Sequence, residues 1–195
     1  MSLSQASGIL LEDEGRERGT TQISQASESM YLFDTGTRHD SVNAMAYSPV
    51  GDLVVGGSMC ALYELPDSPE TCSVTIDEAV ISTDAYASAY ILTMDPSGVP
   101  KDIQMFNSDG GDRVDSIVFA QNGDMLVAGS ACWLQDSACT LTGFGISLPA
   151  VDEGGDAWIA RLGPGGEALW SLMIGSKGFD SIHSVAESPD GSIYI

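Results

Sequence analysis

Short apolar runs separated by glycine and proline dominate the C-terminal part of the chain. Residues 157–162 and 168–174 have the length of β-strands, and neither run shows the i, i+3, i+4 spacing of an amphipathic helix. The Gly-Pro-Gly-Gly motif at 163–166 predicts a tight turn between them, because proline fixes φ and glycine accepts a positive φ. Two further apolar runs follow at 182–186 and 192–195, separated by Pro189-Asp190-Gly191. The pattern therefore predicts a meander of four short antiparallel strands.

The same pattern recurs upstream in phase. Pro164, Gly166, Asp180 and Gly191 are matched by Pro96, Gly98, Asp112 and Gly123, each 68 positions earlier. Asp112, Gly123, Asp124, Gly129, Ser130 and Cys132 are matched by Asp40, Gly51, Asp52, Gly57, Ser58 and Cys60, each 72 positions earlier. Turn glycines and apolar runs kept in step at such a period are typical of repeat architectures. The repeat-turn residues are then Asp40, Gly51, Asp112, Gly123, Asp180 and Gly191.

A single four-stranded sheet has two faces to bury, so each copy needs neighbours. Radial stacking is the propeller solution, typically with about four to eight blades. We therefore predict an all-β fold of β-propeller blades with four antiparallel strands each, in an incomplete ring of about 2.5–3 blades. The predicted segments are a leader or incomplete strand at 1–28, a partial blade at 29–83, a blade at 84–155 and a blade at 156–195 that is truncated in its last strand. Further blades are expected from a missing part of the chain or from another copy.

Motifs in the third copy resemble a known repeat family. They are D-A-W-I-A-R-L-x-P-x-G-x-x-x-W at 156–170, G-x-x-x-x-D-S at 175–181 and P-D-G-S-I-Y-I at 189–195. This combination resembles the SBBP family of β-propeller repeats, although the second copy has Asp102 in place of Trp170 and Asn107 in place of Gly175. The resemblance implies a repeat found mostly in secreted or surface-associated proteins, usually without an assigned reaction.

Four cysteines flank two insertions into the repeat. Cys60 and Cys132 are repeat equivalents, and Cys72 and Cys139 follow them by 12 and 7 positions. Of the three possible pairings, the local pairs Cys60–Cys72 and Cys132–Cys139 are favoured, because equivalent positions on adjacent blades would lie beyond the roughly 7 Å Cα separation that a disulfide tolerates. Such pairing predicts an oxidising compartment and, with the family resemblance, an extracellular or cell-surface location. The alternative is four reduced thiols, and zinc is disfavoured because neither pair has C-x₂-C spacing.

The charge balance is strongly acidic. The chain has 28 Asp and Glu residues against 7 Lys and Arg, a net charge of −21 and a pI of about 4.1. This charge opposes contact with a polyanionic backbone, so nucleic acid is excluded as a partner. Two interpretations of the acidity stay open, a solvated surface that favours solubility and the binding of cations. The sequence has no run long enough for a transmembrane helix and no recognisable signal peptide.

One acidic loop is a weak candidate for calcium, and no other cofactor is expected. Its oxygen-bearing residues are Asn107, Asp109, Asp112 and Asp115. Carboxylate and amide oxygens are the ligands that calcium prefers, although the spacing is not that of an EF-hand. Asp112 also recurs as Asp40 and Asp180, which favours the alternative that its carboxylate accepts backbone N–H groups and fixes a turn.

The insertions at 61–81 and 133–155 are the parts of the chain that depart most from the repeat. Loops on a rigid scaffold often carry binding sites. Trp133 begins the second insertion. An exposed Trp133 would suit a protein or glycan ligand, and the alternative is a plug packed against the edge of the blade.

No catalytic constellation is recognisable in the sequence. His39 and His183 lack partners at metal-ligand spacing, and Ser58 lacks the second glycine of a nucleophile elbow. We therefore predict a non-catalytic, secreted or cell-surface module that binds a protein or glycan through its loops. The alternative is a fragment of a propeller enzyme, either a quinoprotein-like oxidoreductase or a polysaccharide-cleaving enzyme.

Overall fold

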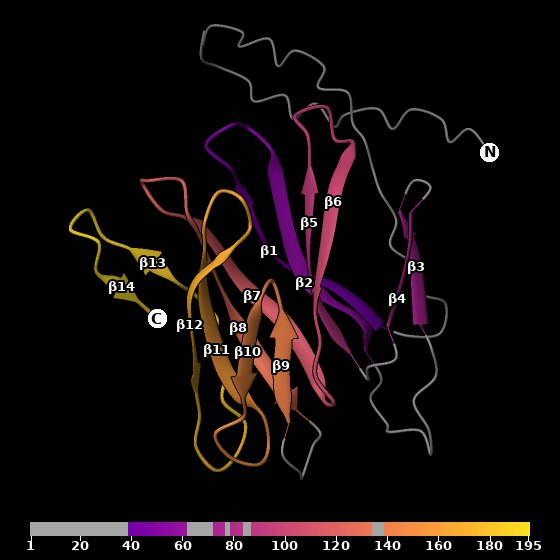
Figure 1. Cartoon of the computed structure of the whole chain (residues 1–195), viewed down its shortest axis with the longest axis vertical. Coiled ribbons are helices and arrows are strands. Elements are labelled where there is room, and N and C mark those ends of the chain that lie inside the picture. Colours follow the sequence, from indigo (N-terminus) through magenta and orange to yellow (C-terminus); the bar gives the residue numbers. More distant parts are fainter. Residues whose placement is uncertain (1–38, 62–71, 77–78, 84–86, 134–138) are drawn as a thin grey trace, which may run out of the picture.

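The computed structural model describes residues 39–61, 72–76, 79–83, 87–133 and 139–195, and these residues form strands and no helix (Figure 1). The predicted leader at 1–28 lies outside the described residues. The strands are β1 His39–Tyr47, β2 Leu53–Ala61, β3 Cys72–Ile76, β4 Ala79–Thr83, β5 Ser88–Met94, β6 Pro100–Phe106, β7 Gly111–Phe119, β8 Met125–Trp133, β9 Thr140–Gly143, β10 Ile146–Pro149, β11 Asp156–Leu162, β12 Ala168–Ile174, β13 Ala186–Glu187 and β14 Ile193–Tyr194. The described part of the chain has no helix with the length and apolar character needed to cross a bilayer.

Most strands belong to two four-stranded antiparallel sheets. The first sheet has the order β1-β2-β5-β6 and the second has the order β7-β8-β11-β12. The pairs β3–β4, β9–β10 and β13–β14 are separate two-stranded hairpins. The expectation of an all-β chain with four-stranded antiparallel sheets is confirmed.

Each large sheet joins two hairpins that are separated in the sequence by an insertion, which begins after Cys60 in the first sheet and after Cys132 in the second. β2 pairs with β5 across the first insertion, and β8 pairs with β11 across the second. The predicted segment boundaries after residues 83 and 155 therefore fall inside these sheets. The insertions form the hairpins β3–β4 and β9–β10, so the strand after each insertion can return to the strand before it.

Five turns repeat one geometry. In each, a glycine with φ between +82° and +91° donates its N–H to the carbonyl three residues earlier at 2.8–3.0 Å. This is the conformation that glycine adopts without a steric penalty, and it closes a hairpin with a bulge. The glycines are Gly51, Gly98, Gly123, Gly166 and Gly191.

Equivalent strands place equivalent side chains on the same face, which we call the forward face of each sheet. The forward face of the first sheet includes Val54, Gly56, Ala89 and Ile91, and that of the second includes Leu126, Ala128, Ala157 and Ile159. The second sheet covers the first at a close approach, since a Cβ at Gly56 would lie 2.7 Å from Val114 Cγ1. The forward face of the second sheet is covered by Ile182 and Val185.

The second sheet and the β9–β10 hairpin complete the main core. Phe106 of β6 is fully buried, and its ring centroid lies 4.6 Å from that of Phe144 and 4.7 Å from that of Trp158. Trp158 donates its indole N–H to the Ser130 carbonyl at 3.2 Å. The β9–β10 insertion is thus part of the hydrophobic core and holds the two sheets together at one side.

Candidate functional site

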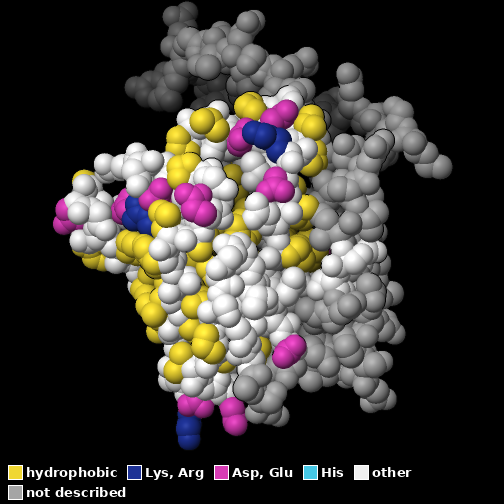
Figure 2. All heavy atoms as spheres, in the orientation of Figure 1, with side chains coloured by type: hydrophobic (Ala, Val, Ile, Leu, Met, Phe, Trp, Pro, Cys, Tyr) yellow, Lys and Arg dark blue, Asp and Glu magenta, His cyan; other side chains and the backbone are white. Residues whose placement is uncertain are grey.

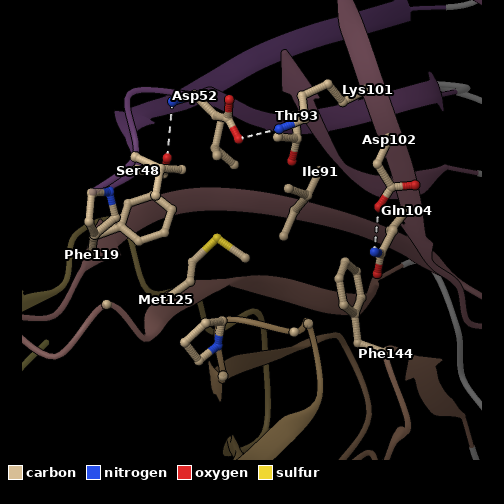
Figure 3. A pocket seen from close by; sticks show the side chains of 18 residues that line it. Ser48, Asp52, Ile91, Thr93, Lys101, Asp102, Gln104, Phe119, Met125 and Phe144 are labelled. Carbon is tan, nitrogen blue, oxygen red and sulfur yellow. Dashed lines mark hydrogen bonds and ion pairs between the residues drawn. The ribbon is translucent and has the colours of Figure 1, made fainter. Parts of the chain in front are cut away.

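A cleft of about 470 Å³ lies between the first and second sheets, at the end of the molecule that carries their hairpin turns (Figure 3). The β1–β2, β7–β8 and β11–β12 turns contribute its walls, and the tip of the β9–β10 hairpin contributes Phe144. The repeat positions these turns at one end because each strand pair reverses at an equivalent glycine. The cleft is therefore a consequence of stacking two copies of the same meander.

The floor of the cleft is apolar. Val54 and Ile91 come from the forward face of the first sheet and are each 3% exposed. Phe119, Met125 and Phe144 approach from the second sheet and its insertion. An apolar floor of this kind favours a ligand group that is itself poorly hydrated.

Charged groups lie on one rim. Lys101 Nζ is 2.7 Å from Asp52 Oδ2, so the only lysine of the lining is already paired. Gln104 donates its amide N–H to Asp102 Oδ2 at 2.6 Å, and Asp102 is exposed. An amide does not neutralise a carboxylate, so this rim keeps a net negative charge from Asp102. The arrangement suits a group that combines apolar surface with a positive charge.

The predicted calcium candidates do not share one centre. Asp112 is fully buried, and its Oδ1 accepts hydrogen bonds from Ser108 Oγ at 2.7 Å and the Cys132 N–H at 3.0 Å. Asp115 instead receives Arg113 Nε at 2.7 Å on Oδ2. Asn107 pairs with Thr142 through its backbone, and Asp109 is exposed. Across the described residues, no three side chains of His, Cys, Asp or Glu come together as a metal site would need.

Burial changes the ionisation of Asp112. The low-dielectric surroundings penalise the charged form and raise the pKa of Asp112 from 3.8 to about 7. Hydrogen bonds from Ser108 and Cys132 act in the opposite direction but are the smaller influence. The second oxygen, Oδ2, is buried without a hydrogen-bond partner in the described part of the chain.

The repeated aspartates hold the cysteines that begin the insertions. Asp40 Oδ1 accepts the Cys60 N–H at 2.9 Å, just as Asp112 accepts that of Cys132. Cys60 and Cys132 have φ values of +64° and +62°, a conformation that a residue with a side chain rarely adopts. The carboxylate therefore stabilises the bend at which the chain leaves the sheet. The signal in the sequence is the equal spacing of 20 positions in both pairs.

The third repeated aspartate makes a local bond instead. Asp180 Oδ2 accepts the Ser176 N–H at 2.7 Å and the Ser176 hydroxyl at 3.1 Å. All three aspartates thus accept backbone N–H groups, as their repetition in the sequence suggested, but the partner of Asp180 lies within its own loop.

The second insertion is closed by the expected disulfide. Cys132 and Cys139 are bonded, with their Cα atoms 5.9 Å apart. Cys60 is also disulfide-bonded, while the side chain of Cys72 lies outside the described residues. Local pairing is thus confirmed for the Cys132–Cys139 pair.

Trp133 is half-buried and packs against the backbone of β7. A Cβ at Gly111 would lie 2.0 Å from Trp133 Cε2, so the indole occupies the space that the glycine leaves. Its Nε1 is also buried, without a partner in the regions that the structure describes. This packing favours the plug interpretation over an open stacking platform for a ligand.

The cleft residues were not identifiable as a group in the sequence. Asp102 lies in β6 of the first sheet and Phe144 in the β9–β10 hairpin, and neither carries a recognisable motif. The available signal was the set of hairpin turns, which a meander brings to one end.

Comparison with known proteins adds no relative. No protein-family model matches the chain, and no curated protein resembles it significantly. The resemblance to SBBP repeats stays a prediction from the motifs alone.

Proposed function

We propose that the chain is a non-catalytic β-propeller repeat module, secreted or displayed at a cell surface, that binds a protein partner through the cleft between its first and second sheets. The cleft carries the proposal, because it joins an apolar floor to an acidic rim at the loop end of a rigid scaffold. In this arrangement further sheets of the same kind complete the ring around the two described here.

The chemistry of the lining favours a peptide segment over a sugar. A desolvated sugar leaves hydroxyl groups that each require a hydrogen-bond partner. The floor offers Val54, Ile91, Phe119, Met125 and Phe144, which supply apolar contact instead. Trp133, the aromatic side chain first considered for a glycan, is packed against Gly111.

The charge of the chain favours a basic partner. A net charge of −21 attracts cationic ligands at long range, and Asp102 supplies a local carboxylate at the rim. A peptide segment in which apolar residues alternate with Lys or Arg would place its apolar side chains on the floor of the cleft and its basic side chains at the rim.

A secreted or surface location is supported by the Cys132–Cys139 bond, since disulfides persist mainly in oxidising compartments. For the enzyme alternative, acid–base groups free to act on a substrate would be needed. Here Lys101 is engaged with Asp52, and Asp102 is the one other charged group of the lining, so the proposal does not extend to catalysis.

The test measures binding of synthetic peptides in which leucine alternates with lysine, glutamate or serine. We expect saturable binding of the Leu/Lys peptide and little binding of the Leu/Glu peptide. Asp102→Lys should weaken the Leu/Lys complex about tenfold by reversing the rim charge. Glu153→Lys is the matched control, because Glu153 is exposed and lies outside the cleft lining.

Equal losses in both variants, or no binding of the Leu/Lys peptide, contradict a protein-binding cleft. A glycan array run in parallel identifies the other ligand class. Saturable glycan binding that Asp102→Lys abolishes would replace the peptide proposal.

A further inference from the structure

The β9–β10 hairpin turns at Phe144 in a conformation that a bulky residue seldom adopts. Phe144 and Gly145 have φ values of +50° and +76°, and Gly143 pairs with Ile146 on either side of them. A two-residue turn with two positive φ values is normally built from asparagine, aspartate and glycine. A phenylalanine in such a turn is strained, and strain of this kind is typical of residues kept for a function. The turn therefore gains something from the Phe144 side chain that outweighs the strain.

Packing against the core accounts for one face of the Phe144 ring. This face is stacked on Phe106, with ring centroids 4.6 Å apart and an interplanar angle of 22°. Phe106 is fully buried and does not line the cleft, whereas Phe144 is half-buried and does line it. The Phe144 ring therefore continues the aromatic stack from the core to the cleft (Figure 3). The face of an aromatic ring attracts a cation.

Two polar side chains of β6 lie beside this ring. A Cβ at Gly143 would lie 2.5 Å from the Met105 carbonyl oxygen, so the hairpin reaches its turn directly against β6. Asp102 and Gln104 are two positions apart on β6, so their side chains share one face, and both line the cleft. Figure 3 shows the Gln104 amide between Asp102 and the Phe144 ring. These three side chains form what we call the β6 corner of the cleft.

The β6 corner offers hydrogen-bond acceptors and a negative charge. Gln104 Nε2 donates to Asp102 Oδ2 at 2.6 Å, which holds the amide nitrogen toward the carboxylate. Asp102 Oδ1 and the Gln104 amide oxygen accept no hydrogen bond from the residues that the structure describes. Lys101 of the same strand is paired with Asp52 at 2.7 Å instead. The corner therefore presents two acceptor oxygens and one carboxylate without a cationic partner, next to an aromatic ring.

The surface around the cleft also favours a cation. Figure 2 shows acidic side chains beside the basic ones in the upper part of the molecule, where Figure 1 places the β1–β2, β5–β6 and β7–β8 turns. The basic side chains on this face are thus matched by neighbouring acids. Because the chain carries a net charge of −21, the field at the turn end attracts positively charged groups.

These features match a guanidinium group better than an ammonium group. A guanidinium is planar and weakly hydrated, and it stacks on an aromatic ring while its N–H groups donate within its own plane. An ammonium is a strongly hydrated point charge whose three donors need acceptors in three directions. The apolar floor supplies none of these acceptors, whereas the two oxygens of the β6 corner lie together beside the Phe144 ring.

We propose that the β6 corner binds an arginine side chain of the partner segment. The guanidinium stacks on Phe144 as a further layer of the aromatic stack, and its N–H groups donate to Asp102 Oδ1 and the Gln104 amide oxygen. This assignment rests on the proposed function, since it names the basic residue that the cleft takes. The second sheet has no such corner, because Trp170 and Leu172 stand at the equivalent positions of β12.

The experiment measures fluorescence anisotropy of labelled peptides in which leucine alternates with arginine, lysine or citrulline, in about 0.15 M salt. We expect the Leu/Arg peptide to bind about tenfold more tightly than the Leu/Lys peptide. Citrulline keeps the planar shape of arginine without its charge, so the Leu/citrulline peptide should bind at least about tenfold more weakly than the Leu/Arg peptide. Equal affinities for Leu/Arg and Leu/Lys would overturn the arginine assignment and leave the protein-binding cleft in place. No binding of either peptide would remove both.

Variants of Phe144 locate the preference at the β6 corner. Phe144→Leu removes the ring and should reduce the preference for Leu/Arg over Leu/Lys to about twofold or less, while Phe144→Tyr keeps the ring and the preference. Phe179→Leu is the matched control, because Phe179 is 54% exposed and lies outside the cleft lining.

Gln104→Leu decides the matter if Phe144→Leu does not fold. It removes one acceptor from an edge strand and should weaken Leu/Arg binding severalfold. Gln121→Leu is its control, because Gln121 is exposed in the β7–β8 turn and lies outside the lining. A preference for Leu/Arg that survives Phe144→Leu, or a Leu/Arg affinity that Gln104→Leu leaves unchanged, would contradict the arginine pocket. Citrulline binding as tight as that of arginine would do the same.

Discussion

The first and second sheets are two versions of one meander with different surroundings. The forward face of the first sheet carries Gly56 where that of the second sheet carries Ala128. The edge strand β6 of the first sheet carries Asp102 where the edge strand β12 of the second sheet carries Trp170. The first sheet is packed closely by its neighbour, and the second presents apolar side chains to solvent. The repeated residues thus define the scaffold, and the residues that differ define what each sheet contacts.

The aspartates in the β1–β2 and β7–β8 turns also keep their position in both sheets while their partners differ. Asp52 and Asp124 occupy equivalent positions, yet Asp52 is paired with Lys101 of β6 and Asp124 with Arg161 of β11, in both cases at 2.7 Å. Arg161 also contacts Glu187 at 2.9 Å and so ties β13 to the second sheet. A repeat fixes where the carboxylate lies, while the source of the cation is decided separately in each copy.

The largest effect is expected where the two sheets are the same. A Cβ at Gly57 would lie 1.8 Å from the Ser41 carbonyl oxygen, and one at Gly129 would lie 2.0 Å from that of Arg113. Both sites adjoin register shifts, so the clash is with backbone that cannot move without breaking the bulge. Gly57→Ala and Gly129→Ala should each lower the free energy of unfolding by about 3 kcal/mol or more in urea titrations.

Gly165→Ala is the control for these two substitutions. The nearest atom to its new Cβ is the end of the flexible Glu167 side chain. A change within about 0.5 kcal/mol is expected at this exposed turn. Similar losses at all three glycines would contradict the account of the bulges.

The second-largest loss of stability is expected at a position where the two sheets differ. Gly56→Ala inserts a methyl group against Val114 and should cost about 1–3 kcal/mol of stability by overpacking. Ala128→Gly removes a buried methyl group at the equivalent position and should cost about 1 kcal/mol. Chemical denaturation of both variants measures which of them loses more stability. A Gly56→Ala variant as stable as the unmodified chain would show that the two sheets are not closely packed at Gly56.

Asp112 should make stability depend on pH. Because its pKa is raised from 3.8 to about 7 by burial, the folded state binds a proton more tightly than the unfolded state. Stability from this group is present below about pH 4 and is lost as the pH rises through about 7. Asp112→Asn removes the titration while keeping an acceptor for the Cys132 N–H.

The measurement compares unfolding of the unmodified chain and Asp112→Asn near pH 5 and near pH 8, on either side of the raised pKa. We expect the unmodified chain to lose stability relative to Asp112→Asn between pH 5 and pH 8. The free energy of unfolding of the unmodified chain minus that of the variant should therefore be smaller at pH 8, or negative. The subtraction matters, since other carboxylates of this acidic chain also respond to pH. A constant difference would mean that Asp112 does not titrate in this window.

The smallest effect concerns the turn ion pairs. The Lys101 side chain is 49% exposed, and Lys101→Met should change the melting temperature by about one degree or less. Arg161→Met should lower it by about a few degrees, because this side chain is 17% exposed and holds both Asp124 and Glu187. Equal shifts of the melting temperature in Lys101→Met and Arg161→Met would show that the ion pairs of the two sheets contribute equally to stability.

Local features of this fold were predictable from the sequence, and long-range pairings were not. Gly51 and Gly123 are recognisable because a positive φ is decided by a few neighbouring residues. The pairing of β2 with β5 spans an insertion, and the sequence on either side of the insertion carries no mark of it. The period of the repeat is visible in the sequence, and the return of the chain across the insertion is not.

The cleft shows the same limit. Phe144 reaches it because the β9–β10 hairpin packs against Phe106 of the other sheet, a contact that depends on the stacking distance. The role of Asp112 was partly predictable, since its recurrence suggested a backbone acceptor. Its partner, the Cys132 N–H, required the register between β7 and β8.

The aspartate-held cysteines fix the points at which the chain leaves the two sheets. The chain leaves each sheet at Cys60 or Cys132 and rejoins it on the neighbouring strand, so both junctions are set by the sheet. The length of the segment between the two junctions does not affect where the chain leaves and rejoins the sheet. Doubling such a loop adds only about 0.6 kcal/mol to the entropy of closing it. Foreign sequence grafted at 134–138 should therefore be carried without disturbing the strands on either side.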